Sequence, residues 1–324
     1  MHELPIRGVS VVVARGGVEL FAAGYGLADG EKRLAASPAT MYPIGLITKT
    51  FTAAAILALR DRGKIALDTP ISRYVPQVPH GSSISVATLL AQRSGLTDLF
   101  GDFAWEKRYQ HASAAQMLET VRDYPLRFPP GTRFEYSNTN YLLLGMALER
   151  AADEPYIQAL HRYVIEPAGI KQTMLAGDQY VAHAVGYQRQ TNASGAPIDI
   201  PDGARMFWGA GGLASSARDL ALFDAALFDG RILRSSSVDE MIKPASQDAE
   251  QAYAMGWFVD EVNGVSRIRH GGNVPGFSSA NDVLPSRKLS VCVLCNLSRI
   301  NAEALADRID QVLVEVPDAH SSIF

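Results

Sequence analysis

Both ends of this 324-residue chain have the pattern of β-strands, and a block of helices separates them. Runs rich in β-forming residues fill 8–26 and 256–296, and turns such as Arg15-Gly16-Gly17 interrupt them. The individual runs are 8–14, 18–26, 256–260, 266–269, 277–284 and 288–296. Strands at both ends predict an α+β fold, in which the N- and C-terminal parts share one antiparallel sheet flanked by helices.

The region between the two β-rich ends predicts a mostly helical lobe inserted into the sheet domain. We expect the sheet domain to comprise residues 1–66 and 205–324, and the lobe residues 67–204. Residues 177–203 are polar and interrupted by glycine and proline, which indicates a loop facing the substrate. Apolar spacing predicts helices at 86–92, 112–122, 140–152, 155–164, 219–228, 236–242 and 302–314.

Composition excludes several classes of partner. A formal net charge of -4 and the lack of any cluster of Lys and Arg give no reason to expect nucleic acid. No stretch approaches the roughly 18 consecutive apolar residues of a spanning helix, so we expect no membrane insertion. The first residues lack a basic segment followed by an apolar one, which favours a cytoplasmic protein; a trimmed exported protein is the alternative.

The cysteines and histidines give no sign of a metal site. Cys292 and Cys295 lie three apart in an expected strand, so their side chains point to opposite faces and pack as small apolar groups. We therefore expect no disulfide and no metal. No cofactor motif is found in the chain, and a small molecule is the expected ligand. The histidines without metal-ligand spacing are His80, His111, His161 and His183.

One lysine is out of character with its surroundings. Residues 42–57 indicate a turn at Gly45 that leads into an alanine-rich helix, and Lys49 falls in the first turn of that helix. A long cation in an apolar helix must extend to solvent, find a partner or face a cavity.

Two further motifs follow Lys49 along the chain. Tyr136-Ser137-Asn138 precedes a helical run, and His270-Gly271-Gly272 ends a strand-like run. In this order the three motifs resemble those of the serine β-lactamase and penicillin-binding-protein superfamily, most closely class C β-lactamases, D-alanyl-D-alanine carboxypeptidases and related esterases. The resemblance covers about residues 6–314, and supporting phrases lie at 129–138, 209–216 and 275–279.

The resemblance implies a role for each motif residue. Lys49 and Tyr136 would share the proton transfers, and Asn138 would hold Lys49 and a substrate amide. His270 would set the potential near Tyr136 or bind a substrate carboxylate. The backbone N–H groups of residues 46 and 273 would form the oxyanion hole. The implied substrate-binding residues are Leu46, Asn138, Gly271, Gly272 and Asn273.

The chain departs from the family pattern at one position. The first motif of the family is S-x-x-K, whereas this chain has Leu46-Ile47-Thr48-Lys49. A leucine side chain has neither an acidic proton nor a lone pair, so it cannot form an acyl-enzyme. Thr48 lies on another face of the helix and Ser137 is expected to face away, so neither is a favoured replacement.

Three functions remain open at this point. The chain is a hydrolase scaffold that binds substrate without its nucleophile, or a non-covalent acid–base enzyme that uses Lys49, Tyr136 and His270 for an isomerisation, cyclisation or elimination, or a non-catalytic binding protein. Each residue alone also has a structural interpretation: Tyr136 as a core aromatic, Asn138 as a helix N-cap and His270 as a core histidine.

Overall fold

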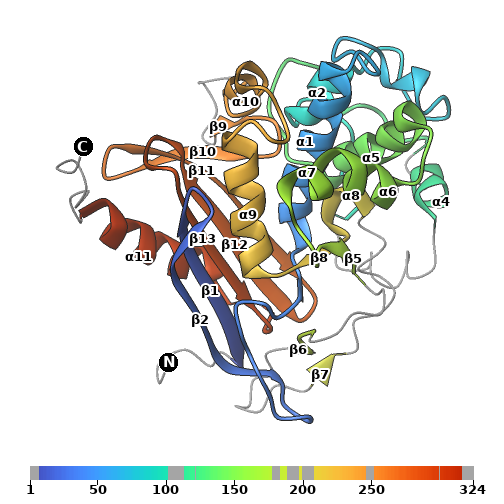
Figure 1. Ribbon diagram of the computed structural model, residues 1–324. Helices are drawn as coiled ribbons and strands as arrows, with labels where there is room; N and C mark the ends of the chain where they lie inside the picture. Colours follow the sequence, from blue (N-terminus) through green and yellow to red (C-terminus); the bar gives the residue numbers. More distant parts are fainter. Residues whose placement is uncertain are drawn as a thin grey trace.

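The computed structural model describes residues 7–100, 113–120, 122–176, 183–187, 197–198, 208–245, 252–298 and 300–315. A large antiparallel sheet forms one side of the molecule and helices gather on the other (Figure 1). The eight strands, in spatial order, are β3 (Leu34–Ala35), β2 (Val18–Asp29), β1 (Gly8–Arg15), β13 (Leu289–Cys295), β12 (Phe277–Leu284), β11 (Val265–Val274), β10 (Phe258–Val262) and β9 (Ala252–Tyr253).

The N- and C-terminal parts of the chain meet at the centre of this sheet. β1 pairs with β13 in antiparallel register, with Val9 opposite Cys295 and Arg15 opposite Leu289. Both strands are apolar on both faces because helices cover the sheet from two sides, which buries valine and leucine in alternating directions. The predicted α+β fold with a shared antiparallel sheet is therefore confirmed.

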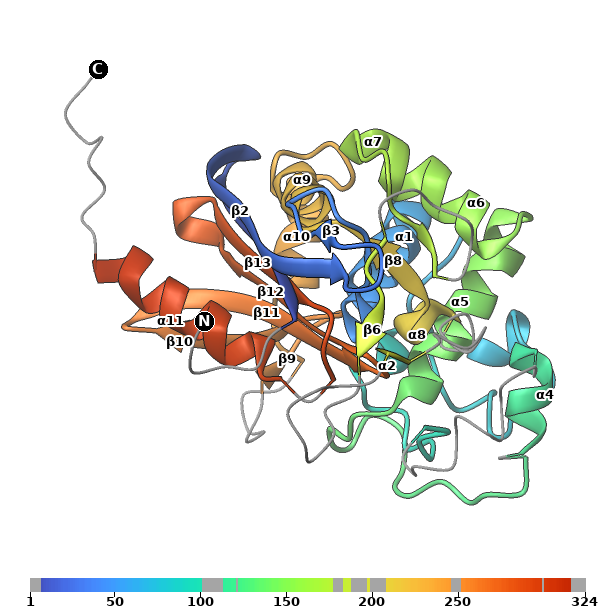
Figure 2. The same cartoon turned by 90° about the horizontal axis from the view of Figure 1, so that it is seen from below.

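Two helices cover opposite faces of the sheet (Figure 2). α9 (Ala217–Phe228) packs on β1 and β13, and α11 (Ala302–Glu315) packs on β12 and β13. Cys292 belongs to the core under α9 and Cys295 to the core under α11, so the two free thiols point apart as predicted.

The remaining helices form the other side of the molecule. They are α1 (Thr48–Asp61), α2 (Val86–Leu90), α4 (Ala114–Glu119), α5 (Asn138–Ala152), α6 (Tyr156–Leu160), α7 (Glu166–Ala168), α8 (Trp208–Gly211) and α10 (Ser235–Met241). Short pieces of 3-10 helix occur at Gly45–Ile47, Ile71–Arg73 and Pro285–Arg287, and His161–Ile165 forms a π-helical turn. Small sheets join β4 (Tyr42–Pro43), β8 (Leu213–Ser215) and β5 (Met174–Leu175), and also β6 (Gly186–Tyr187) and β7 (Pro197–Ile198).

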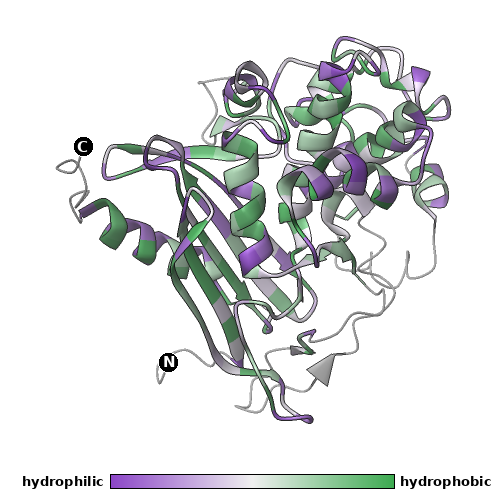
Figure 3. Cartoon of the chain, viewed as in Figure 1, coloured by the Kyte–Doolittle hydropathy of each residue, from purple (hydrophilic) through white to green (hydrophobic). Residues whose placement is uncertain are grey.

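Apolar residues line the strands and the inward faces of these helices (Figure 3). The helix α1 is buried along almost its whole length among α5, α8 and α10, with Phe51 stacked on Phe223 of α9 at 3.9 Å between ring centroids. The helix ends at Arg62 and Gly63 follows with φ +70°, the conformation expected of a glycine just beyond a helix.

One predicted strand boundary is wrong. The strand expected at 266–269 extends to Val274, because β11 continues to pair with β12 from Ile268 as far as Val274. Ser216 caps α9, as its Oγ atom accepts a hydrogen bond from Asp219 N. α10 begins at Ser235, and its N-cap residue Arg234 makes no side-chain capping bond.

Candidate functional site

Lys49 is buried in the first turn of α1, with no exposed surface. Its Nζ atom donates hydrogen bonds to Asn138 Oδ1 at 2.7 Å and to the carbonyl oxygen of Ala210 at 2.8 Å. The ammonium position is therefore fixed by two acceptors from α5 and α8, and the side chain does not extend to solvent.

The surroundings of Lys49 favour its uncharged form. Burial lowers the pKa of Lys49 well below its ordinary value, and the carboxylate of Asp98 opposes part of that shift. The Nζ atom also lies 5.0 Å from the centre of the Tyr136 ring and 5.7 Å from that of Tyr141. An amine with a lowered pKa in such a place can accept a proton near neutral pH.

Asn138 links Lys49 to a carboxylate. It is the first residue of α5, and the N-cap residue Ser137 makes no side-chain capping bond. The Nδ2 atom of Asn138 donates to Asp98 Oδ2 at 3.1 Å, while its Oδ1 atom accepts from Lys49. The interpretation of Asn138 as a helix cap is wrong, because its side chain crosses to other segments.

Tyr136 and His270 share an aromatic compartment. Their ring centroids are 6.3 Å apart, and the rings of Tyr253 and Phe258 lie 6.1 and 6.0 Å from that of Tyr136. Within the described part of the chain, Tyr136 Oη and His270 Nε2 are both buried and make no hydrogen bond. Burial raises the pKa of Tyr136 well above its ordinary value, so the hydroxyl keeps its proton.

His270 is a neutral imidazole rather than a cation. It is 1% exposed, and its Nδ1 atom lies 2.7 Å from the carbonyl oxygen of Gly271, which fixes the proton on Nδ1. Burial is the main cause that lowers the pKa of His270, to about 3. The unprotonated Nε2 atom is thus a hydrogen-bond acceptor inside the aromatic compartment.

The 3-10 turn that carries Leu46 lies against β11. Gly45 has φ +54°, and a methyl group on Gly272 would lie 2.3 Å from Ile44 O and 3.0 Å from Leu46 N. Only glycine at 272 therefore permits this close approach. A methyl group on Gly45 would lie 3.6 Å from Asn273 N, so the backbone of the Leu46 turn lies against that of residues 272 and 273.

Gly271 and Asn273 differ from Gly272 in their surroundings. A methyl group on Gly271 would lie 2.1 Å from Glu303 Oε1, so this residue faces α11 on the other side of the sheet. The side chain of Asn273 is exposed. The structure brings Leu46, Lys49, Tyr136, Asn138, His270 and Gly272 together, with Gly271 adjacent only through its backbone.

Sequence reasoning missed three residues of this region, the half-buried Asp98 and the buried Gln92 and Tyr253. Gln92 has φ +58°, and its Oε1 atom accepts from Ser137 N at 3.1 Å and from Asn140 Nδ2 at 2.5 Å. Its carbonyl oxygen accepts from Glu135 N at 3.0 Å. No motif marks these positions, since polar residues near Ser94-Gly95 have the pattern of an ordinary turn.

An acidic cluster lies between β12 and α11. In the described part of the chain, one oxygen of each of Asp282, Asp307 and Asp310 lies within 4.8 Å of the others. Arg267 Nη1 lies between them, at 3.4, 2.5 and 2.9 Å respectively, so a guanidinium already occupies the position of a cation.

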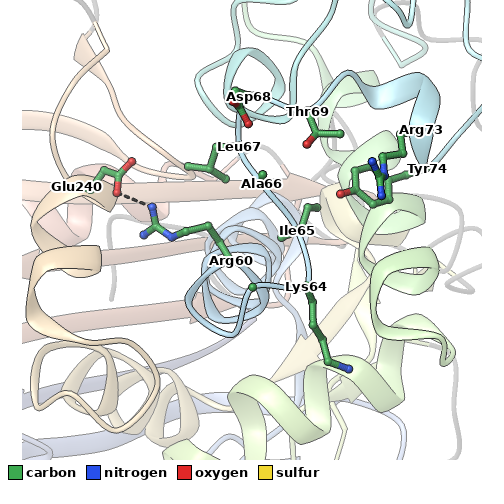
Figure 4. Close-up of a pocket in the computed structure, with 11 residues that line it drawn as sticks. Arg60, Lys64, Ile65, Ala66, Leu67, Asp68, Thr69, Arg73, Tyr74 and Glu240 are labelled. Atoms are coloured by element: carbon green, nitrogen blue, oxygen red, sulfur yellow. Dashed lines mark hydrogen bonds and ion pairs between the residues drawn. The ribbon is translucent and has the colours of Figure 1, made fainter.

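A separate pocket of about 610 Å³ opens at the far end of α1 (Figure 4). Arg60 on its wall is bonded to Glu240, while Lys64 extends away from the hollow. Arg60 is eleven residues beyond Lys49, about 16 Å along the helix axis. This pocket contains none of the predicted site residues.

Other predictions fall partly outside the described residues. The substrate-facing loop predicted at 177–203 lies outside them except for 183–187 and 197–198. Among the helices that the structure describes, none is long and apolar enough to span a membrane.

Two known bacterial proteins have sequences similar to this chain over most of its length. The chain is 28% identical over 300 residues to the putative penicillin-binding protein PbpX of Bacillus subtilis, covering 92% of this chain and 72% of that protein. It is 27% identical to protein flp of Staphylococcus aureus, covering 95% of this chain but only 63% of the length of flp.

Solved structures have the same fold. The octameric penicillin-binding protein homologue from Pyrococcus abyssi superposes with a TM-score of 0.86 at 25% identity, covering 97% of this chain and 75% of that chain. The D-stereospecific amidohydrolase from Streptomyces sp. gives 0.80 at 25% identity, covering 96% and 95%. The family model described as Beta-lactamase matches residues 1–315, and the chain therefore belongs to this family.

Proposed function

We propose that this chain is a β-lactamase-family hydrolase scaffold that binds an ester, amide or β-lactam group but lacks the serine that would attack it. Leu46 carries this proposal. It is the only residue of 41–50 that is not buried, and it lies three positions before Lys49. A side chain open to solvent at that position supports a place beside the substrate, where an isobutyl group has no nucleophilic atom.

The polar groups around Leu46 support retained binding. Lys49, Asn138 and His270 are each at least nine-tenths buried, and burial of polar groups without a role is costly. Within the described part of the chain, Tyr136 Oη and His270 Nε2 are buried without a hydrogen-bond partner, so a donor and an acceptor remain unused in this region.

The neighbouring hydroxyls give no support for a relocated nucleophile. Thr48 Oγ1 donates to Gly45 O at 2.7 Å and accepts from Leu213 N at 3.1 Å, so it serves the turn itself. Ser137 is 1% exposed. A nucleophile needs an open approach to the substrate carbonyl as well as a neighbouring base.

The similar proteins suggest which substrates to test. One similar structure is a D-stereospecific amidohydrolase, and that of a D-amino acid amidase from Ochrobactrum anthropi holds D-phenylalanine. The rings of Tyr136, Tyr253 and Phe258 offer an apolar wall that suits an aromatic acyl group. D-phenylalanine amide is therefore a first choice, beside p-nitrophenyl esters and a chromogenic cephalosporin.

A second candidate function is non-covalent acid–base catalysis. The observation that favours it is the juxtaposition of a protonated phenol, a neutral imidazole and a lysine with a lowered pKa. Together they provide a proton donor in Tyr136, a proton acceptor in Lys49 and a hydrogen-bond acceptor in His270, groups that an isomerisation, cyclisation or elimination can use.

The experiment compares the parent protein with the Leu46→Ser and Leu46→Ala variants on the substrate panel. We expect turnover, and labelling by a fluorophosphonate, only with Leu46→Ser. The Leu46→Ala variant removes the bulk of the leucine without supplying a hydroxyl. It therefore distinguishes the effect of a new nucleophile from the effect of a smaller side chain.

Each other outcome contradicts the proposal. Covalent labelling of the parent protein would mean that another nucleophile operates. Equal turnover by parent and Leu46→Ala would favour the acid–base candidate. Ligand binding without turnover by any variant would favour a non-catalytic binding protein.

A further inference from the structure

Asp98 makes three hydrogen bonds, and two of them go to the same residue. Its Oδ2 atom accepts from Asn138 Nδ2 and its Oδ1 atom accepts from Asn138 N, both at 3.1 Å. The Oδ1 atom also accepts from Phe100 N at 3.1 Å, which closes the turn that holds the carboxylate. Asp98 thus accepts hydrogen bonds from both the side-chain amide and the backbone N–H of Asn138.

The amide of Asn138 could in principle point either way. Its oxygen only accepts and its nitrogen only donates, so rotation by 180° about the last bond exchanges the two functions. An ionised carboxylate only accepts, and therefore Asp98 can bond only to Nδ2. This leaves Oδ1 directed at Lys49, whose Nζ atom has Ala210 O as its other acceptor.

We propose that Asp98 is a positioning residue, which fixes the amide orientation of Asn138 and through it the place and proton affinity of Lys49. Only the effect of Asp98 on catalysis rests on the proposed function. The orientation itself follows from the donor and acceptor chemistry of three side chains.

The alternative orientation would be unfavourable for Lys49. With Nδ2 turned toward it, a protonated Lys49 would face a second donor and lose one of its two acceptors. A buried donor left without an acceptor destabilises the arrangement. Asp98 removes this alternative because its own oxygens would then face Oδ1, an arrangement of acceptors only.

The same carboxylate supplies the compensating charge for Lys49. The groups that face Lys49 are Asp98, the rings of Tyr136 and Tyr141, and the neutral His270. Asp98 is the negative group among them that raises the pKa of Lys49. Asp98 also lies at the N-terminus of α5, where the helix dipole stabilises a carboxylate.

The test follows the titration of Lys49 by NMR in protein labelled at lysine, with Leu46 unchanged. Asp98→Asn is expected to lower the pKa of Lys49, because the negative charge is lost and the amide is free to rotate. The matched control is Asp219→Asn, a buried carboxylate on α9 that accepts from Gln172 N at 2.8 Å. The control is expected to leave the Lys49 titration unchanged.

A reciprocal double variant keeps the test decisive if Asp98→Asn folds poorly. Asp98→Asn combined with Asn138→Asp restores one donor facing one acceptor but moves the carboxylate next to Lys49. We expect this exchange to raise the pKa of Lys49 above that of the parent. An unchanged Lys49 titration in both variants, or an equal change in Asp219→Asn, would overturn the proposal.

Activity provides a separate measurement in the Leu46→Ser background. There Asp98→Asn is expected to lower kcat/KM about tenfold and to move the acidic limb of the pH profile to lower pH. If Leu46→Ser does not turn over at all, the proposed function fails while the NMR titration still decides the role of Asp98.

Discussion

The Nζ atom of Lys49 donates a 2.7 Å hydrogen bond to Asn138 Oδ1, although 89 positions separate the two residues in the sequence. The bond joins the first turn of α1 to the first residue of α5. Both helices start at the same place in the fold, so the start of each helix carries one part of the site. The predictions below concern the groups that hold this arrangement in place.

The proton-transfer groups are expected to matter once a nucleophile is present. In the Leu46→Ser background, Lys49→Ala and Tyr136→Phe should each lower kcat/KM by about 10²–10⁴, the usual contribution of a positioned acid or base. Steady-state kinetics on a p-nitrophenyl ester measures this. Tyr124→Phe is the control because Tyr124 is 52% exposed. Unchanged kinetics in both site variants would remove these residues from the mechanism.

Gln92 is expected to stabilise the turn that carries Tyr136. Gln92→Met keeps the side-chain volume but leaves the donors Ser137 N and Asn140 Nδ2 without their acceptor. We expect a loss of about 2 kcal/mol or more in the free energy of unfolding, measured by urea denaturation. The exposed Gln158 on α6 provides the control Gln158→Met, with an effect within about 0.5 kcal/mol. Equal stabilities of the two variants would contradict the role of Gln92.

Gly272 and Gly271 are expected to respond differently to a methyl group. In Gly272→Ala the new carbon meets the backbone oxygen of Ile44, whereas in Gly271→Ala it meets the carboxylate end of Glu303. A flexible side chain can move aside more readily than a backbone, so Gly272→Ala should cost about 1–3 kcal/mol and Gly271→Ala less.

The same pair also reports on the site. Gly272→Ala pushes on the turn of Leu46 and should weaken binding of D-phenylalanine amide, measured by calorimetry, while Gly271→Ala should leave it nearly unchanged. A larger loss of affinity in Gly271→Ala would mean that the ligand lies on the α11 side of the sheet.

Asp224 is expected to make stability depend on pH. It is 1% exposed, accepts from Asn281 Nδ2 at 2.9 Å, and burial raises its pKa to about 7. The folded protein therefore holds a proton that the unfolded chain releases above about pH 4. The bound proton stabilises the folded state by at most about 4 kcal/mol in the free energy of unfolding. This stabilisation is fully present below about pH 4 and is lost as the pH rises through about 7.

Urea unfolding of the parent and of Asp224→Asn between pH 4 and pH 8 measures this effect. The asparagine keeps an acceptor for Asn281 but has no proton to lose. The free energy of unfolding of Asp224→Asn, relative to that of the parent, should therefore increase as the pH rises. Parallel pH profiles would show that Asp224 does not titrate in this range.

The sequence was sufficient for elements whose cause is local. Alternation of apolar residues predicted β12 at 277–284 with its observed bounds, and the helical spacing of 302–314 predicted α11 to within one residue. The alternation of side chains along a strand also placed Cys292 and Cys295 on opposite faces. Such patterns record which side of an element is buried, and that information is present in a short window.

Polar contacts between distant segments could not be predicted in the same way. The three motifs identified Lys49, Tyr136, Asn138 and His270, but nothing in the sequence indicated that Asp98 would hold the Asn138 amide. A hydrogen bond depends on atoms to within a few tenths of an ångström. The path of an intervening loop decides such positions, and no periodicity encodes that path.

By itself, the sequence determined the shared antiparallel sheet, the lysine at the start of a buried helix and the leucine three positions before that lysine. Only the tertiary structure decided that His270 is neutral, that Gly272 faces the Leu46 turn while Gly271 faces α11, and that Asp98 is the carboxylate behind Lys49. The physical reason is that burial and charge depend on which segments pack together, whereas strand and helix patterns depend on neighbours along the chain.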